Sequence, residues 1–181
     1  DGYIPFISGG IGGADALKAQ RDHVEQCYID EGKDPATIPL GVLRFACISD
    51  EKAVIDRYVD GARFQKRIAN ALRNRRETMV DDYMVEEVPG ENEETLEQIT
   101  ENLLVGDAEG VAERICQEIE LYRPRHMNIY FAVGDMPHRA VIDSMEQFAT
   151  KVVPAIEKHF GKPLAEINDV PMPQPLPMAA E

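Results

Sequence analysis

One arginine stands inside an otherwise apolar stretch and could carry chemistry. Arg44 interrupts the segment IPLGVLRFACIS (38–49), which is nearly continuous in apolar residues and therefore predicts a buried strand. A guanidinium there needs an anionic partner, because a buried charge is costly unless it is paired. That partner is either a bound anionic group or a carboxylate of the protein, and the sequence leaves both alternatives open.

A glycine cluster and a histidine are weaker candidates for a binding site. The glycine cluster SGGIGG (8–13) follows an expected strand and precedes an expected helix, which is where a phosphate could bind. It lacks the G-x-G-x-x-G spacing, and Asp15 at the helix start repels phosphate, so a simple turn is the favoured interpretation. His138 lies in the first turn of another expected helix, where a surface or capping role is favoured over binding.

Cysteine and histidine do not predict a metal centre or a disulfide framework. The three cysteines are odd in number, lie far apart and form no CxxC pair, as expected for a reducing cytoplasm. Cys47, inside an expected strand, is most simply a small buried hydrophobe. No metal-ligand spacing is formed by the histidines His23, His126 and His159.

The charge and length of the chain exclude several classes of protein. The 181 residues are 44% hydrophobic, which is enough for a sizeable core, and the net charge is -14. So acidic a chain is not expected to bind nucleic acid or an anionic membrane. Neither a signal peptide nor an apolar run of roughly 20 residues is found, and the sequence therefore predicts a soluble cytoplasmic protein.

The elements that must position these residues alternate between strands and helices. Strands are expected over 3–8, 38–49 and 126–133. Helical spacing with cap and stop signals predicts helices over 15–31, 51–73 after an Asp50 cap, 108–123 after an Asp107 cap, and 138–160, which Pro154 either bends or divides from a final turn. This alternation predicts an α/β fold, with parallel strands covered by helices.

Two segments stand outside that pattern. Residues 74–102 are acidic and broken by Pro89-Gly90, which predicts a mobile excursion with helical pieces. Residues 161–181 contain PMPQPLPM (171–178) and predict an extended, proline-rich tail.

Several motifs, in order, resemble a known family. The segment 103–156 contains VG-x-x-E-x-VAER, F-x-x-GDMPH and F-A-x-x-V-x-PAI, and resembles the C-terminal signature of the bacterial luciferase-like, flavin-dependent monooxygenases. DGYIP (1–5) resembles the DGW-x-P strand of that family, and 31–53 resembles its Gly-x-Asp-Pro turn, seventh strand and following helix start. The resemblance covers residues 1–160.

The resemblance implies a particular architecture. The family fold is an eight-stranded TIM (β/α)8 barrel with its active site at the C-terminal mouth of the strands. The present strands resemble the last three βα units, so the first five are expected to be missing. The apolar strand edges then need a cover, which predicts a homo-oligomer or pairing with a missing N-terminal half.

The resemblance also implies a reaction. In the family, reduced FMN from a partner flavin reductase reacts with O2, and a small organic substrate is oxidised. Whether the isolated chain is an active enzyme stays open. Two alternatives are a deazaflavin-dependent reductase, which shares the same C-terminal motifs, and a non-catalytic α/β module that self-associates.

Candidate site residues follow from the same resemblance. Arg44 is the expected catalytic residue, facing flavin peroxide or an anionic substrate. The residues expected to bind substrate or cofactor are Phe6, Ser8, Asp135 and His138. Arg75 and Arg76 precede the excursion, which in the family can fold over the mouth as a lid; a solvated helix end is the favoured alternative for these arginines.

Overall fold

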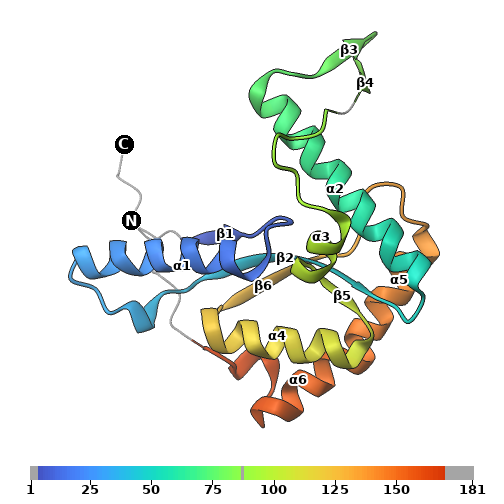
Figure 1. Cartoon of the computed structure of the whole chain (residues 1–181). Coiled ribbons are helices and arrows are strands. Elements are labelled where there is room, and N and C mark those ends of the chain that lie inside the picture. Colours follow the sequence, from blue (N-terminus) through green and yellow to red (C-terminus); the bar gives the residue numbers. More distant parts are fainter. Residues whose placement is uncertain (1–3, 87, 170–181) are drawn as a thin grey trace, which may run out of the picture.

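A parallel sheet forms the centre of the molecule, and β2 is its middle strand (Figure 1). The computed structural model describes residues 4–86 and 88–169. The sheet contains β1 (Phe6–Ser8), β2 (Gly41–Ile48), β5 (Leu104–Gly106) and β6 (His126–Tyr130). The first half of β2 pairs with β1 and β6, and its last three residues pair with β5. Seven of the eight residues of β2 are buried, as the apolar sequence predicts.

Helices lie on both faces of this sheet. The first face is covered by α1 (Gly13–Asp30), α4 (Ala108–Tyr122) and α6 (Val153–Phe160), which pack on alternate residues of β2 such as Val42 and Ala46. The second face is covered only in part, by α2 (Lys52–Asn74) and α3 (Leu96–Asn102), which pack on Phe45 and Cys47. The predicted α/β fold with parallel strands and covering helices is therefore confirmed.

The predicted N-cap residue is correct for α4 and wrong for α2. Asp107 caps α4 as predicted, and its Oδ1 accepts a hydrogen bond from the Gly110 amide at 2.8 Å. The predicted Asp50 cap is wrong, because Glu51 occupies the N-cap position of α2. The Ser49 hydroxyl accepts a hydrogen bond from the Glu51 amide at 3.1 Å, within the three-residue turn, 49–51, that separates β2 from α2.

The last predicted helix is divided near Pro154. It consists of α5 (His138–Gln147), a π-helical turn (Phe148–Val152) and α6. Proline cannot donate an amide hydrogen bond to the preceding turn, and the wider π turn accommodates that loss. Two short 3-10 turns complete the regular structure, at Pro35–Thr37 and Leu164–Glu166.

The segment predicted as an excursion, 74–102, has two different parts. The first is a hairpin of β3 (Thr78–Val80) and β4 (Tyr83–Glu86), which α2 carries away from the sheet (Figure 1). The second is α3, which returns to the core and buries Ile99 completely. It leads into β5, a strand that sequence periodicity did not predict because three residues are too few to show a period.

The described part of the proline-rich region is short. Ile167 is buried there, and Asp169 is ion-paired with Arg125. The remainder of the predicted tail, 170–181, lies outside the described residues. Among the described residues, no helix has the length and apolar character needed to cross a membrane.

Candidate active site

Part of the second sheet face has no helix over it, and the strands place mixed side chains there. Strand register aligns Phe6 with Gly41 and His126, and Ser8 with Leu43 and Asn128. A third pair aligns Phe45 with Tyr130. Residues aligned in this way, two apart along each strand, share one face of a sheet. The exposed members of this face are Phe6, Ser8, His126, Asn128 and Tyr130. We call Phe6, Ser8, Asn128 and Tyr130, together with the half-buried Leu43, the open face.

Two aromatic rings dominate the open face. Phe6 is 51% exposed and Tyr130 is 41% exposed, which is high for aromatic residues of a parallel sheet. The Phe6 ring lies across Gly41: a Cβ atom added to this glycine would come within 2.2 Å of the ring. Tyr130 packs edge-to-face against Phe45, with ring centroids 5.3 Å apart. The open face therefore offers fixed, flat apolar surfaces between polar groups.

Ser8 ends β1 and begins the glycine loop. Its hydroxyl accepts the Gly10 amide at 3.2 Å, and the Gly12 amide donates to the Gly9 carbonyl at 2.8 Å. These contacts make the loop a tight turn. A Cβ atom on Gly13 would lie 2.6 Å from the Asn102 side-chain oxygen, so the start of α1 is closed by α3. Asp15 lies in the first turn of α1 and adds negative charge there.

Arg44 faces the opposite, helix-covered side of β2. Its Nε and Nη2 donate to the two carboxylate oxygens of Glu118 at 2.9 and 2.8 Å, and Nη2 also donates to the Asn102 carbonyl at 2.8 Å. Arg44 is 1% exposed and Glu118 is 6% exposed. The sequence left open whether the partner of Arg44 is a bound anion or a carboxylate of the protein. The structure shows a carboxylate of the protein, Glu118 of α4. The catalytic role of Arg44 stays a prediction.

Glu118 is a buried residue that sequence reasoning missed. Burial raises the pKa of its carboxyl group, and Arg44 opposes that shift. It lies on the same stripe of α4 as Val111, Ile115 and Tyr122, all of them buried. Glu118 could have been found from the sequence, because a glutamate on an otherwise apolar helix stripe is expected to be buried and to need a cationic partner.

Asp135 and His138 lie where the chain leaves β6. Arg57 of α2 donates to both oxygens of Asp135 at 3.1 and 2.7 Å, and both side chains are exposed. This pairing holds the pKa of the Asp135 carboxyl below its usual range. His138 is exposed at the first position of α5. The two predicted residues are thus close in sequence. Within the described part of the chain, the Asp135 side chain forms an ion pair, whereas no polar contact is found for the His138 side chain.

A pocket of about 460 Å³ lies beside this ion pair. Asp135 and Gly134 line one side, and Phe64 and Arg63 of α2 line the other. The backbones of Gly61 and Gly134 approach so closely that a Cβ atom on Gly134 would lie 2.8 Å from the Cα of Gly61. Gly134 also has a φ of +54°, which glycine adopts without strain.

Arg75 and Arg76 are placed at the base of the hairpin. Arg75 ends α2 in a left-handed conformation with a φ of 53°, and both side chains are exposed. Figure 1 shows the hairpin directed away from the sheet. The lid role of these arginines stays a prediction.

Cys47 and Tyr58 mark the boundary where the second face becomes sealed. Burial raises the pKa of the Cys47 thiol to about 11, so the thiol stays protonated at neutral pH and is a poor nucleophile. Tyr58 is fully buried, and its hydroxyl donates to the Tyr130 carbonyl. α2 thereby closes the second face beyond Tyr130.

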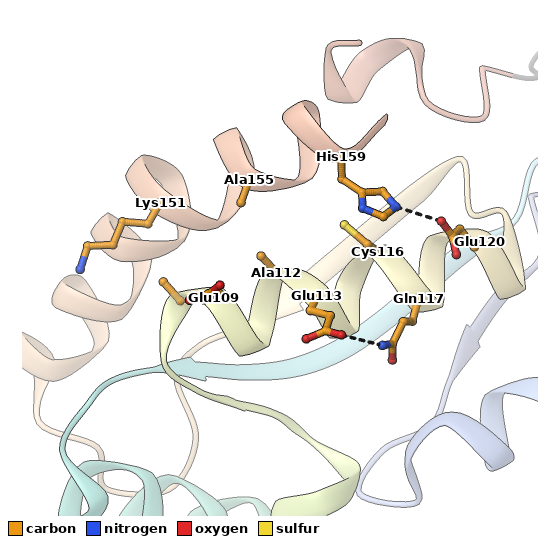
Figure 2. Close-up of a pocket in the computed structure, with 10 residues that line it drawn as sticks. Glu109, Ala112, Glu113, Cys116, Gln117, Glu120, Lys151, Ala155 and His159 are labelled. Atoms are coloured by element: carbon orange, nitrogen blue, oxygen red, sulfur yellow. Dashed lines mark hydrogen bonds and ion pairs between the residues drawn. The ribbon is translucent and has the colours of Figure 1, made fainter. Parts of the chain in front are cut away.

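Another pocket, of about 580 Å³, lies between α4 and α6 in the outer helical layer (Figure 2). Its floor contains Ala112, Ala155 and Cys116, and at one end His159 is 2.9 Å from Glu120. Burial raises the pKa of the Cys116 thiol, which disfavours the reactive thiolate. Among the described residues, no cluster of histidine, cysteine and carboxylate side chains has the arrangement of a metal site. The open face is therefore the stronger candidate.

Comparisons with known proteins bear on the fold. No family model matches the chain. The uncharacterized protein y4vJ of Sinorhizobium fredii (strain NBRC 101917 / NGR234) is 30% identical over 162 residues, which are 90% of this chain and 46% of that protein.

Two solved structures are similar to the chain. One is the oxygenating constituent of 3,6-diketocamphane monooxygenase of Pseudomonas putida, a type II Baeyer-Villiger monooxygenase in complex with FMN. It matches 85% of this chain and 43% of its own chain, with 22% identity and a TM-score of 0.55. Long-chain alkane monooxygenase (LadA) matches 84% of this chain and 36% of its own, with 15% identity and a TM-score of 0.49.

The lengths of these proteins differ consistently from that of the chain. The chain spans about half the length of the curated relative and less than half of the FMN-bound monooxygenase. The likeness to that monooxygenase concerns the fold: the parallel strands and covering helices described above occur in an enzyme that binds FMN.

Proposed function

We propose that this chain forms the C-terminal portion of a luciferase-like, flavin-dependent monooxygenase barrel, and that β1, β2 and β6 are its last three strands. The single observation that carries the proposal is the match of 85% of the chain to the FMN-bound monooxygenase, of which it covers 43%. The motifs of residues 103–156 and the glycine-aspartate-proline turn support the same assignment. In this proposal, a partner flavin reductase supplies reduced flavin.

The open face fits the ring system of a flavin. Phe6, Leu43 and Tyr130 offer apolar and aromatic surface, and Ser8 and Asn128 offer polar groups beside it. Most small-molecule sites combine such a surface with a few polar side chains that fix orientation. When bound, reduced FMN would activate O2 for transfer of an oxygen atom to a small organic substrate. The chain would stack against the ring, orient it and keep water from one of its sides.

The described residues fit the phosphate of FMN less well. The arginines near the strand ends are already paired with carboxylates: Arg57 with Asp135, Arg63 with Asp60, and Arg67 with Glu93. Asp15 disfavours an anion at the start of α1. We therefore propose that a second body, either the N-terminal half of the barrel or another subunit, provides the phosphate site.

A flavin titration of the purified chain tests this proposal. Flavin fluorescence is followed with FMN and with lumiflavin, which carries the ring but no phosphate, while light scattering gives the mass of the complex. We expect both flavins to bind saturably, with dissociation constants within about threefold of each other, because the ring provides the contacts. If neither FMN nor lumiflavin binds, the proposal is overturned. If FMN binds much more tightly than lumiflavin, the assignment of the phosphate site to a second body is contradicted.

One observation favours a second candidate function. α2 and α3 seal the second face over Phe45 and Cys47, which shortens the surface available to a ligand. A non-catalytic α/β module that self-associates would use such a closed core. When a deazaflavin is titrated in parallel, a discrete oligomer that binds neither flavin nor the deazaflavin would favour this alternative, whereas selective binding of the deazaflavin would favour a reductase.

A further inference from the structure

The β3–β4 hairpin is a two-stranded sheet, with a register shift between Thr78 and Met79, and it has no further strand paired to it in the described part of the chain. Its two-residue turn consists of Asp81 and Asp82, with φ values of 50° and 66°. Positive φ at both positions is the signature of the tight hairpin turn that matches strand twist. β3 pairs with β4 only, so the outer edge of β3 is open among the described residues.

The hairpin exposes apolar side chains that a monomer would leave in water. Tyr83 is 76% exposed, and Met79, Val80 and Val85 are each about half exposed. An isolated two-stranded hairpin is marginally stable in water, and an open apolar strand edge readily pairs with another strand. The open outer edge of β3 is therefore a place where a further strand can pair.

The charges at the two ends of the hairpin have opposite sign. Arg75 and Arg76 lie at its base, and Asp81 and Asp82 form its tip. All four side chains are exposed, and none forms an ion pair within the described residues. A strand with one basic and one acidic end complements a copy of itself that runs in the opposite direction.

We propose that the partner of this hairpin is the hairpin of a second copy of the chain. The β3 strands pair antiparallel across a two-fold axis and form a four-stranded sheet from the two hairpins. With the axis near Met79, Arg76 of each copy lies opposite Asp82 of the other copy. Both contacts are identical by symmetry, and Met79 and Val80 are covered along the joined edge. This proposal does not depend on flavin binding.

Sedimentation velocity over a wide concentration range tests the proposal on the full chain. We expect a monomer–dimer equilibrium that weakens as salt is raised, because the end contacts are exposed ion pairs. Arg76→Glu and Asp82→Lys should each weaken the dimer by about tenfold, because each creates two like-charge contacts in the symmetric interface. The control Lys162→Glu makes the same charge change as Arg76→Glu at an exposed site away from the hairpin and should leave the dimer unchanged.

Mixing the two variants provides the sharpest test. In a heterodimer of the Arg76→Glu chain with the Asp82→Lys chain, both end contacts are again of opposite charge. We expect the mixture to dimerise with near wild-type affinity, although neither variant does so alone. Failure of the mixture to recover would overturn the antiparallel two-fold arrangement.

A turn variant separates loss of charge from loss of the hairpin. Asp81→Asn with Asp82→Gly keeps the residues that this turn prefers and removes both negative charges. We expect several-fold weaker dimerisation with an unchanged melting temperature. A chain that is monomeric at every concentration, or a dimer indifferent to all hairpin variants, would overturn the proposal. The hairpin would then serve as a lid on its own sheet or dock on another protein.

Discussion

The two faces of β2 differ in what surrounds alternate residues of one strand. On the first face, Val42, Arg44 and Ala46 lie under α1 and α4 and are 1% exposed or less. On the second face, Leu43 lies beside the exposed Phe6, Ser8 and Asn128. The buried ion pair of Arg44 and Glu118 thus lies on the first, helix-covered face, which we call the sealed face, whereas the exposed Phe6, Tyr130 and Asn128 lie on the open face. Residues of the sealed face therefore stabilise the fold, whereas residues of the open face are accessible to a ligand.

The largest expected effect comes from breaking the ion pair on the sealed face. Glu118→Ala leaves the buried Arg44 guanidinium without its carboxylate and should lower the free energy of unfolding by about 3–5 kcal/mol. Urea denaturation measures the change. The control Glu120→Ala, two positions along α4 and exposed, should cost under about 1 kcal/mol. Equal effects of the two substitutions would contradict the assigned role of Glu118.

Thiol reactivity locates the boundary between the sealed and open parts of the second face. Cys27 is exposed on α1, whereas α2 covers Cys47. At pH 8, alkylation of Cys47 should be at least about a hundredfold slower than that of Cys27. Since the pKa of Cys47 is raised to about 11, its rate should increase with pH until that value is approached. Peptide mapping by mass spectrometry follows each site, and comparable rates at pH 8 would show that α2 leaves this end of the face open.

The contact between Phe6 and Gly41 tests the packing of the open face itself. Gly41→Ala places a methyl group against the Phe6 ring and should cost about 1–3 kcal/mol. Because Phe6 is half exposed, Phe6→Ala should relieve most of that cost in the double variant. Thermal and urea unfolding of the two single variants and the double variant measure the coupling, and strict additivity would contradict the contact.

The smallest effect on stability is expected for a polar residue of the open face. Asn128 is exposed, and no hydrogen bond of its side chain is found among the described residues. Asn128→Ala should therefore change the free energy of unfolding by less than about 0.5 kcal/mol. Its effect should appear instead in flavin affinity. A clear loss of stability would assign Asn128 to the fold rather than to the site.

Sequence patterns predicted the sheet and its helices because those elements are long and strongly periodic. β2 and α4 lie within three residues of their expected ranges. The hairpin and β5 were not predicted, since strands of three or four residues carry no usable period. The Asp50 cap failed because Ser49, one residue earlier, satisfies the Glu51 amide.

The sequence indicated several residues of the candidate site, but not the face of the sheet on which each side chain lies. The sequence required a partner for Arg44, but a single strand does not reveal which of its faces will be covered. That information arises from the packing of α4, which brings Glu118 to the guanidinium. Phe6 and Ser8 were predicted binding residues and lie on the open face, whereas their companions Asn128 and Tyr130 become apparent only from strand register.

Flavin titration of matched tyrosine variants tests the central claim most directly, namely that the open face is the ligand surface. Tyr130→Ala removes a ring from the open face, and Tyr83→Ala removes an exposed ring from the hairpin. We expect Tyr130→Ala to weaken lumiflavin and FMN binding by about tenfold, and Tyr83→Ala to leave it unchanged. Equal affinities of both variants and the wild-type chain would contradict the claim.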